Sequence, residues 1–205
     1  MLKENPFTKL VSKIIQDKPK LAERKLQSLE WFRNKIQSTL TGREASPLDT
    51  FTTMQKIRFN FPGQMFTFQY TPKGKSELPY FDKFPLVFVV DVLKDGFIGL
   101  NFHYIRPFDR ALIMDKMYKY LGKKNDKAVL KVTYKMLSTQ AQFAAYKPCI
   151  RRYKYTQMHT NIVILEPEEW DIALFLPTEK FLSFTGGTTN KKTIWETSSK
   201  IIRKR

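Results

Sequence analysis

Acidic side chains in and beside the most apolar part of the sequence are the first candidates for catalysis. A magnesium-dependent nuclease needs two or three carboxylates that converge on one or two metal ions, close to a lysine or histidine. The candidates here are Asp82, Asp91, Asp95 and Asp109. A turn explains Asp95, the end of a strand explains Asp91, and the first turn of a helix explains Asp109. We therefore predict that the chain is not an enzyme, with a metal-dependent nuclease as the lesser alternative.

Metal ligands and cofactor-binding motifs are equally sparse. The sequence has two histidines, His103 and His159, and one cysteine, Cys149, and none of them stands at a zinc-ligand spacing. The glycines of the GGTT segment at 186–189 lack the preceding strand and the lysine-serine pair of a phosphate-binding loop. We predict no metal, no cofactor and no small-molecule substrate, and we expect His103 to be a satisfied polar residue at a sheet edge or under a helix.

The overall charge points to a polyanionic partner. Lysine and arginine total 36 against 19 acidic residues, which gives a net charge of +17. A field of this sign attracts nucleic acid, so DNA bound without sequence preference is the expected partner. The same charge is also compatible with docking on an acidic protein surface.

The basic residues are concentrated in one part of the chain. Between Lys119 and Lys154 the sequence has ten basic residues and one acidic residue, Asp126. Tyrosines interleave with these cations, and the mixture can hold phosphates and stack unpaired bases. Taken singly, each tyrosine is better explained as a half-buried side chain with a solvated hydroxyl. The residues predicted to bind DNA are Lys119, Lys123, Lys124, Lys127, Lys131, Lys135, Lys147, Arg151, Arg152, Lys154, Lys191, Lys192, Arg203, Lys204 and Arg205.

The elements that would position these residues suggest an α+β fold. Alternating or continuous apolar residues predict strands at 62–71, 84–93, 97–104 and 161–166, with a hairpin at Asp95-Gly96. We expect a small antiparallel sheet, with a partly closed, SH3-like barrel as one form of it. Helices are predicted after Pro19, Pro107, Pro148 and Pro167, because proline favours the first position of a helix.

Changes in composition predict four parts of the chain. These are an N-terminal helical arm at 1–45, a linker at 46–58, an α+β core domain at 59–188 and a basic C-terminal segment at 189–205. No run of residues approaches the roughly 20 apolar positions of a membrane span, so no membrane contact is expected.

Three segments resemble a known protein family. They are LPYFDKFPLV at 78–87, GFIGLNFHYIRP at 96–107 with Arg110 just beyond it, and WDIALFLPTEKF at 170–181. Together they resemble the DNA end protector, or terminal DNA-protecting, proteins of large contractile-tailed bacteriophages. The resemblance covers about residues 60–184, and no motif can be placed in residues 1–58 or in the basic tail.

The resemblance implies a non-enzymatic virion protein that is made in the host cytoplasm. Such a protein joins the filled head before tail attachment and shields the ends of the packaged genome from host exonuclease. Phage proteins of this size and charge also serve in the neck, tail or baseplate. The alternative is therefore a structural adaptor or completion protein whose basic arms dock on neighbouring virion proteins.

Overall fold

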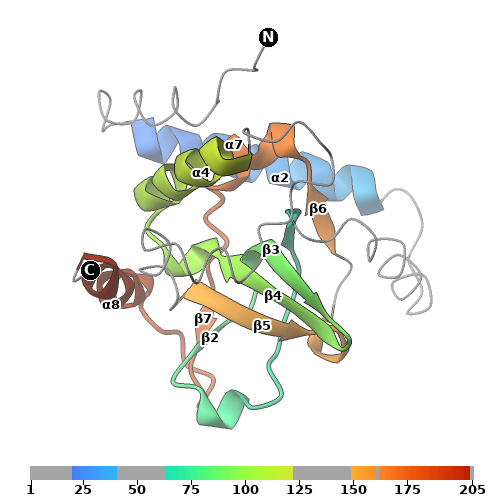
Figure 1. The fold of residues 1–205 in the computed structure, drawn as a ribbon, viewed down its shortest axis with the longest axis vertical. Coiled ribbons are helices and arrows are strands. Elements are labelled where there is room, and N and C mark those ends of the chain that lie inside the picture. Colours follow the sequence, from blue (N-terminus) through green and yellow to red (C-terminus); the bar gives the residue numbers. More distant parts are fainter. Residues whose placement is uncertain (1–19, 41–62, 122–148, 160–161, 204–205) are drawn as a thin grey trace.

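An antiparallel sheet of five strands forms the centre of the fold, with the strand order β5–β4–β3–β1–β6 (Figure 1). The computed structural model describes residues 20–40, 63–121, 149–159 and 162–203. The strands are β1 (Met65–Thr67), β3 (Leu86–Leu93), β4 (Gly96–Asn101), β5 (Ile150–Lys154) and β6 (Val163–Leu165). A second sheet pairs β2 (Phe81–Asp82) with β7 (Phe181–Leu182). The predicted α+β fold with a small antiparallel sheet is confirmed. The sheet is open, with β5 and β6 as its edges, and does not take the partly closed barrel form that was offered as one possibility.

Burial on both faces explains why β3 is almost continuously apolar. Leu86, Phe88 and Val90 belong to the core cluster on one face, and Val87 and Val89 belong to the cluster on the other. Successive side chains of a strand point to opposite faces, so a strand buried on both faces has no polar positions to alternate with. The apolar ribbon in the sequence is therefore the central strand of the sheet.

The predicted hairpin joins β3 to β4. Leu93 pairs with Gly96 across the two-residue turn. Gly96 is required by the close approach of the next strand, since a Cβ atom there would lie 1.9 Å from the backbone oxygen of Tyr153. The hairpin therefore depends on a residue without a side chain at the position where β5 packs against it.

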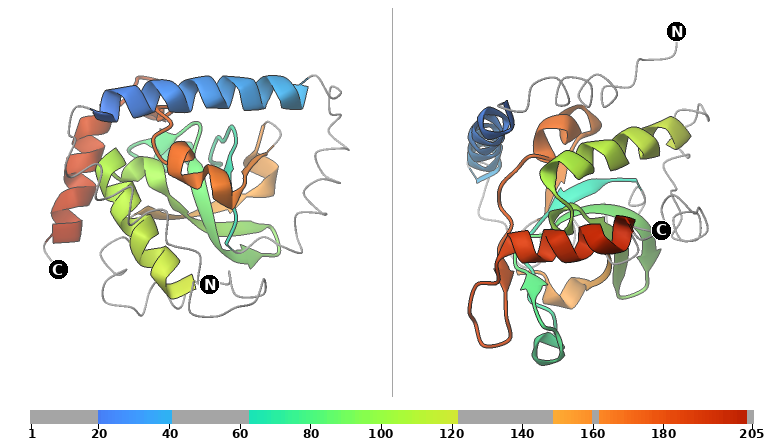
Figure 2. Two further views of the ribbon diagram at one scale, coloured as in Figure 1. Left: turned by 90° about the horizontal axis from the view of Figure 1, so that it is seen from above. Right: turned by 90° about the vertical axis from the view of Figure 1, so that its left-hand side faces the viewer.

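Helices cover one face of the sheet and its margin. They are α2 (Lys20–Leu40), α4 (Pro107–Leu121), α7 (Trp170–Ala173) and α8 (Lys191–Arg203). Figure 1 shows α2, α4 and α7 together on one side of the sheet, and Figure 2 shows α8 as a separate helix at the margin. Short 3₁₀ helices occur at η1 (Lys75–Glu77), η2 (Phe102–Tyr104), η5 (Tyr155–Gln157) and η6 (Pro167–Glu169). None of the described helices is long and apolar enough to cross a membrane.

The helix predicted after Pro19 is α2, and it is attached to the rest of the fold. Ser28 Oγ donates a hydrogen bond of 2.7 Å to the carbonyl oxygen of Ile172 in α7. Lys35 Nζ lies 2.6 Å from Glu169 Oε2. The predicted division of the chain into four parts stays a prediction, and the linker at 46–58 lies outside the described residues.

The helix predicted after Pro148 is wrong, because this segment forms the edge strand β5. Tyr153 is buried and stacks on Phe97 of β4 with ring centroids 5.4 Å apart. Tyrosine and isoleucine pack well on a pleated surface, and the ladder with β4 pairs one side of the strand's backbone. The cations of this segment therefore stand on a sheet edge rather than on a helix.

Candidate nucleic-acid interface

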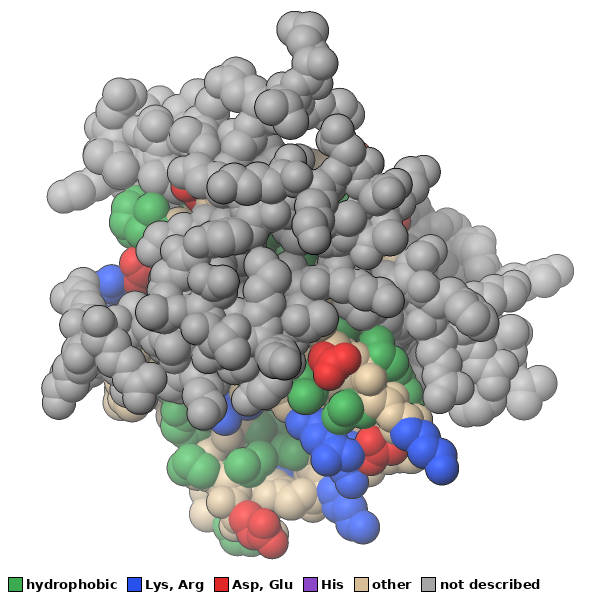
Figure 3. All heavy atoms as spheres, in the orientation of Figure 1, with side chains coloured by type: hydrophobic (Ala, Val, Ile, Leu, Met, Phe, Trp, Pro, Cys, Tyr) green, Lys and Arg blue, Asp and Glu red, His purple; other side chains and the backbone are tan. Residues whose placement is uncertain are grey.

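The edge strand β5 carries three of the predicted DNA-binding residues. Arg151 and Arg152 are exposed, and Lys154 is partly exposed. Side chains alternate along a strand, so Arg151 shares a face with the buried Tyr153 while Arg152 and Lys154 lie on the opposite face. Figure 3 shows basic side chains gathered with an acidic one near the end of the β3–β4 hairpin.

An ion-pair cluster holds two of these cations at the hairpin. Arg152 Nη2 lies 2.8 Å from Asp95 Oδ1 and 3.1 Å from Oδ2, and Lys154 Nζ lies 3.7 Å from Oδ2. The hydrogen bond from Arg152 lowers the pKa of Asp95 below its ordinary value. Two cations share one carboxylate, so the cluster keeps a net positive charge.

Arg151 has an aromatic rather than an acidic neighbour. Its guanidinium carbon lies 4.6 Å from the centre of the Tyr104 ring, within the range of a cation–π contact. Burial raises the pKa of Tyr104, so its hydroxyl stays neutral beside the arginine at ordinary pH. No ion pair joins Arg151 to a carboxylate within the part of the chain that the structure describes, so this cation is available to an anionic ligand.

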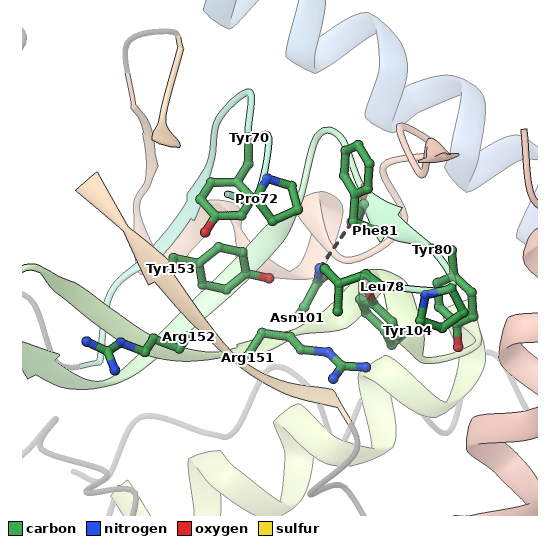
Figure 4. Close-up of a pocket in the computed structure, with 12 residues that line it drawn as sticks. Tyr70, Pro72, Leu78, Tyr80, Phe81, Asn101, Tyr104, Arg151, Arg152 and Tyr153 are labelled. Carbon is green, nitrogen blue, oxygen red and sulfur yellow. Dashed lines mark hydrogen bonds between the residues drawn. The ribbon is translucent and has the colours of Figure 1, made fainter. Parts of the chain in front are cut away.

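A cavity of about 260 Å³ lies beside Arg151 (Figure 4). Its walls come from the loop at 70–72, the segment at 78–82 and strands β4 and β5. Five of its twelve lining residues are aromatic, and they are Tyr70, Tyr80, Phe81, Tyr104 and Tyr153. The cavity is therefore an aromatic pocket with arginine at its margin.

A buried polar network includes two residues that line this cavity, Asp82 and Asn101. Asp82 Oδ2 lies 2.8 Å from His103 Nδ1 and accepts a hydrogen bond of 3.1 Å from Asn101 Nδ2. The backbone N–H of Phe84 donates to Asp82 Oδ1 at 3.2 Å. Since both carboxylate oxygens have partners, Asp82 fixes β2 against the end of β4.

A second buried network connects the helices. Arg110 is fully buried and donates hydrogen bonds to the carbonyl oxygens of Ile105 and Leu174, and to the carboxylate of Glu179. Lys191 Nζ, at the start of α8, lies 3.6 Å from the same carboxylate. Burial alone raises the pKa of Glu179, but Arg110 and neighbouring cations lower it to about 2. The ionised carboxylate therefore joins α4 to the segment before β7 and to α8.

The predicted DNA-binding residues do not form one patch in the described part of the chain. Arg151, Arg152 and Lys154 share strand β5, while Lys191, Lys192 and Arg203 share helix α8 at the margin of the fold. Lys119 and Arg203 lie in helices α4 and α8, but the structure does not describe their side chains. The remaining predicted residues lie outside the described residues, and they are Lys123, Lys124, Lys127, Lys131, Lys135, Lys147, Lys204 and Arg205.

The four aspartates considered for a nuclease do not converge. Asp82 binds His103, Asp95 binds Arg152, and Asp109 Oδ2 lies 2.7 Å from Arg106 Nε. Asp91 accepts a hydrogen bond from the backbone of the next residue in β3. Across the described ranges, no three histidine, cysteine or acidic side chains are grouped as metal ligands.

The sequence patterns did not predict the cavity or the two buried networks. Apart from Lys191, the residues of the two networks come from the three segments on which the family resemblance rests, with Arg110 just beyond one of them. LPYFDKFPLV supplies Asp82, GFIGLNFHYIRP supplies Asn101 and His103, and WDIALFLPTEKF supplies Glu179. Polar residues inside otherwise apolar segments could have indicated buried hydrogen bonds. The partners in these bonds could not be predicted, because they are far apart in the chain.

Comparison with known proteins gives a match to a protein family. A model of the family described as phage T4 terminal DNA protecting protein matches residues 2–198, which is almost the whole chain. No curated protein and no solved structure shows significant similarity. The chain therefore belongs to the family of phage T4 terminal DNA protecting proteins, which are bacteriophage virion proteins that protect DNA ends.

Proposed function

We propose that this protein protects the ends of a phage genome by binding the DNA backbone there without sequence preference and without catalysis. The observation that carries the proposal is the placement of Arg151, Arg152 and Lys154 on an open sheet edge. Membership of a DNA-protecting family supports DNA as the polyanion that these cations meet.

Backbone contacts suit the chemistry of this edge. Arginine and lysine contacts to phosphate position a protein on DNA but carry no sequence information. Arg152 and Lys154 reach solvent beyond the hairpin, with 55% and 44% of their side chains exposed. Phosphate oxygens can replace or join Asp95 as their partner at little cost, since exposed ion pairs contribute at most about 1 kcal/mol.

Salt dependence and DNA topology test the proposal. Fluorescence anisotropy would compare a blunt linear duplex, the same duplex circularised and a single strand over a sodium chloride series. Contacts to about six phosphates predict a loss of roughly a thousandfold in affinity between 50 and 200 mM salt. Tighter binding to the linear form, with slower digestion of that form by an added exonuclease, supports end protection.

A charge-matched pair of variants separates the edge from the general field of the protein. Arg152→Gln/Lys154→Gln should flatten the plot of log affinity against log salt by about 0.9 for each lost phosphate contact. Arg33→Gln/Lys180→Gln removes the same charge at exposed positions elsewhere and should change the slope less. Equal affinity for heparin, linear and circular DNA would instead favour the adaptor alternative, in which the basic surface docks on acidic virion proteins.

A further inference from the structure

The aromatic cavity beside β5 has a composition that neither the family match nor the backbone proposal explains. Figure 4 shows Tyr70 and Tyr153 on one side of it and Tyr80 and Tyr104 on the other, with Asn101 and Arg151 between them. The ring centroids are 5.0 Å apart in the first pair and 6.1 Å apart in the second. All four tyrosines line the cavity, where Tyr80 is partly exposed and Tyr70, Tyr104 and Tyr153 are buried.

The polar groups of the cavity favour an anionic ligand over a cationic one. Both oxygens of Asp82 are engaged by partners inside the fold, so this carboxylate does not offer a free acceptor. The guanidinium of Arg151 stacks on Tyr104 and has no described carboxylate beside it. A fixed cation next to several aromatic faces matches a ligand that combines a flat ring with a phosphate.

The size of the cavity restricts the ligand further. Sites for drug-sized molecules usually have volumes of roughly 300–1,000 Å³, and this one has about 260 Å³. A single nucleotide is of the right order, whereas a base that is still paired and stacked in a duplex is held with its partner and neighbours and cannot enter a cavity of this size. Stacking on aromatic side chains does not depend on sequence, because every base has a flat face.

We propose that the cavity binds the unpaired terminal nucleotide of a DNA end, with its base against the tyrosines and its phosphate at Arg151. The proposal rests on the proposed function only in taking the DNA end as the source of the nucleotide. It adds a reason for distinguishing an end from the interior of a duplex, since only an end can release a nucleotide from its stack at little cost.

Photo-crosslinking to the full-length protein tests the placement of the base. A duplex carrying 5-iodo-deoxyuridine as a one-nucleotide overhang should crosslink to Tyr80 or Tyr104, as mapped by mass spectrometry. The same base at an internal paired position should give no crosslink to these rings. Crosslinks at the overhang that map only outside the cavity would overturn the proposal.

Two matched pairs of variants test the chemistry of the site by anisotropy. Arg151→Gln should lower the affinity for the overhang about tenfold relative to a circular duplex. Arg33→Gln removes the same charge at an exposed position of α2, whose residues do not line the cavity, and should leave this ratio unchanged. Leu78→Glu puts a negative charge at the rim of the cavity, where Leu78 is 38% exposed. Leu26→Glu makes the same change on α2, where Leu26 is 68% exposed, and it should keep the preference for the overhang.

The two proposals fail in different ways. If the wild type prefers linear to circular DNA but Arg151→Gln and Leu78→Glu behave like their controls, the cavity proposal is wrong and end binding stands. If the wild type binds no duplex, end binding is wrong, and so is the proposal that the cavity binds the terminal nucleotide of a DNA end. A titration with the fluorescent mononucleotide 2-aminopurine deoxyriboside monophosphate then shows whether the cavity takes a free nucleotide, through a signal that Leu78→Glu abolishes.

Discussion

His103 Nδ1 lies 2.8 Å from Asp82 Oδ2, with both side chains almost completely buried. This contact joins the small β2–β7 sheet to the 3₁₀ turn that follows β4. The same turn is held from the other side, because Trp195 Nε1 in α8 donates a hydrogen bond of 2.8 Å to the carbonyl oxygen of His103. Three parts of the chain that are distant in sequence therefore meet at His103.

Replacing Asp82 by alanine should destabilise the protein strongly. The substitution leaves Asn101 Nδ2, the backbone N–H of Phe84 and His103 Nδ1 without their acceptor in a buried site. Unsatisfied buried groups cost about 1–3 kcal/mol each, so we expect a loss of about 3 kcal/mol or more in the free energy of unfolding, measured by urea denaturation. Asp109→Ala removes only a partly exposed pair with Arg106 and should cost less than about 1 kcal/mol. Equal losses in the two variants would contradict the role given to Asp82.

Stability should fall in acid because of Glu179. Its pKa is about 2 in the folded protein and 4.5 in an ordinary environment, so between these values the unfolded chain binds a proton that the folded chain does not. The contribution of Glu179 is therefore complete above pH 4.5 and is lost as the pH falls towards 2. Each pKa unit corresponds to roughly 1.4 kcal/mol, so the change over this window is about 3 kcal/mol.

The variant Glu179→Gln tests that pH dependence when its free energy of unfolding is measured by urea denaturation over a pH series. The variant should lose about 3–5 kcal/mol at pH 7, because Arg110 is left as a buried charge, and its stability should vary less between pH 5 and 3 than that of the wild type. Glu168→Gln, at an exposed position in η6, should keep the pH dependence of the wild type. A variant Glu179→Gln that follows the wild-type pH profile would show that another carboxylate is responsible.

The periodicity of the sequence predicted the central sheet better than it predicted the site. β3 and β4 were predictable because a long apolar run followed by Asp-Gly allows few other structures. β5 was predicted as a helix because it follows Pro148, and its short run of three cations and one buried tyrosine has no regular alternation to indicate a strand. The ion pair between Arg110 and Glu179 joins residues 69 positions apart, and a local pattern carries no information on such a pair.

Cys149 should be unreactive in the folded protein. Its side chain is buried, and burial raises the pKa of the thiol to about 12. The thiolate is the reactive form, so reaction with Ellman's reagent at pH 8 should be limited by opening of the structure and should become fast in denaturant. Ser76→Cys, at an exposed position in η1, should add one thiol that reacts at once. Rapid reaction of a single thiol in the native wild type would contradict the burial of Cys149.

Gly96→Ala should uncouple β5 from the sheet and weaken DNA binding together with it. A Cβ atom at Gly96 would lie 1.9 Å from the backbone oxygen of Tyr153, so the two strands must separate or shift in register. Overpacking of this kind costs about 1–3 kcal/mol, and the loss should appear in thermal unfolding. DNA affinity should fall in the same variant at a temperature where it is still folded, because Arg151 and Arg152 depend on β5 for their position.

Gly74→Ala is the matched control for that experiment. A Cβ atom there would lie 3.6 Å from the flexible carboxylate of Glu77, which is an ordinary contact distance, and the backbone φ of −89° suits alanine. Stability and DNA affinity should therefore stay close to those of the wild type. If Gly96→Ala is destabilised but binds DNA with unchanged affinity and salt dependence, the cations of β5 are not the DNA-binding residues, and the proposed interface must be sought on another element.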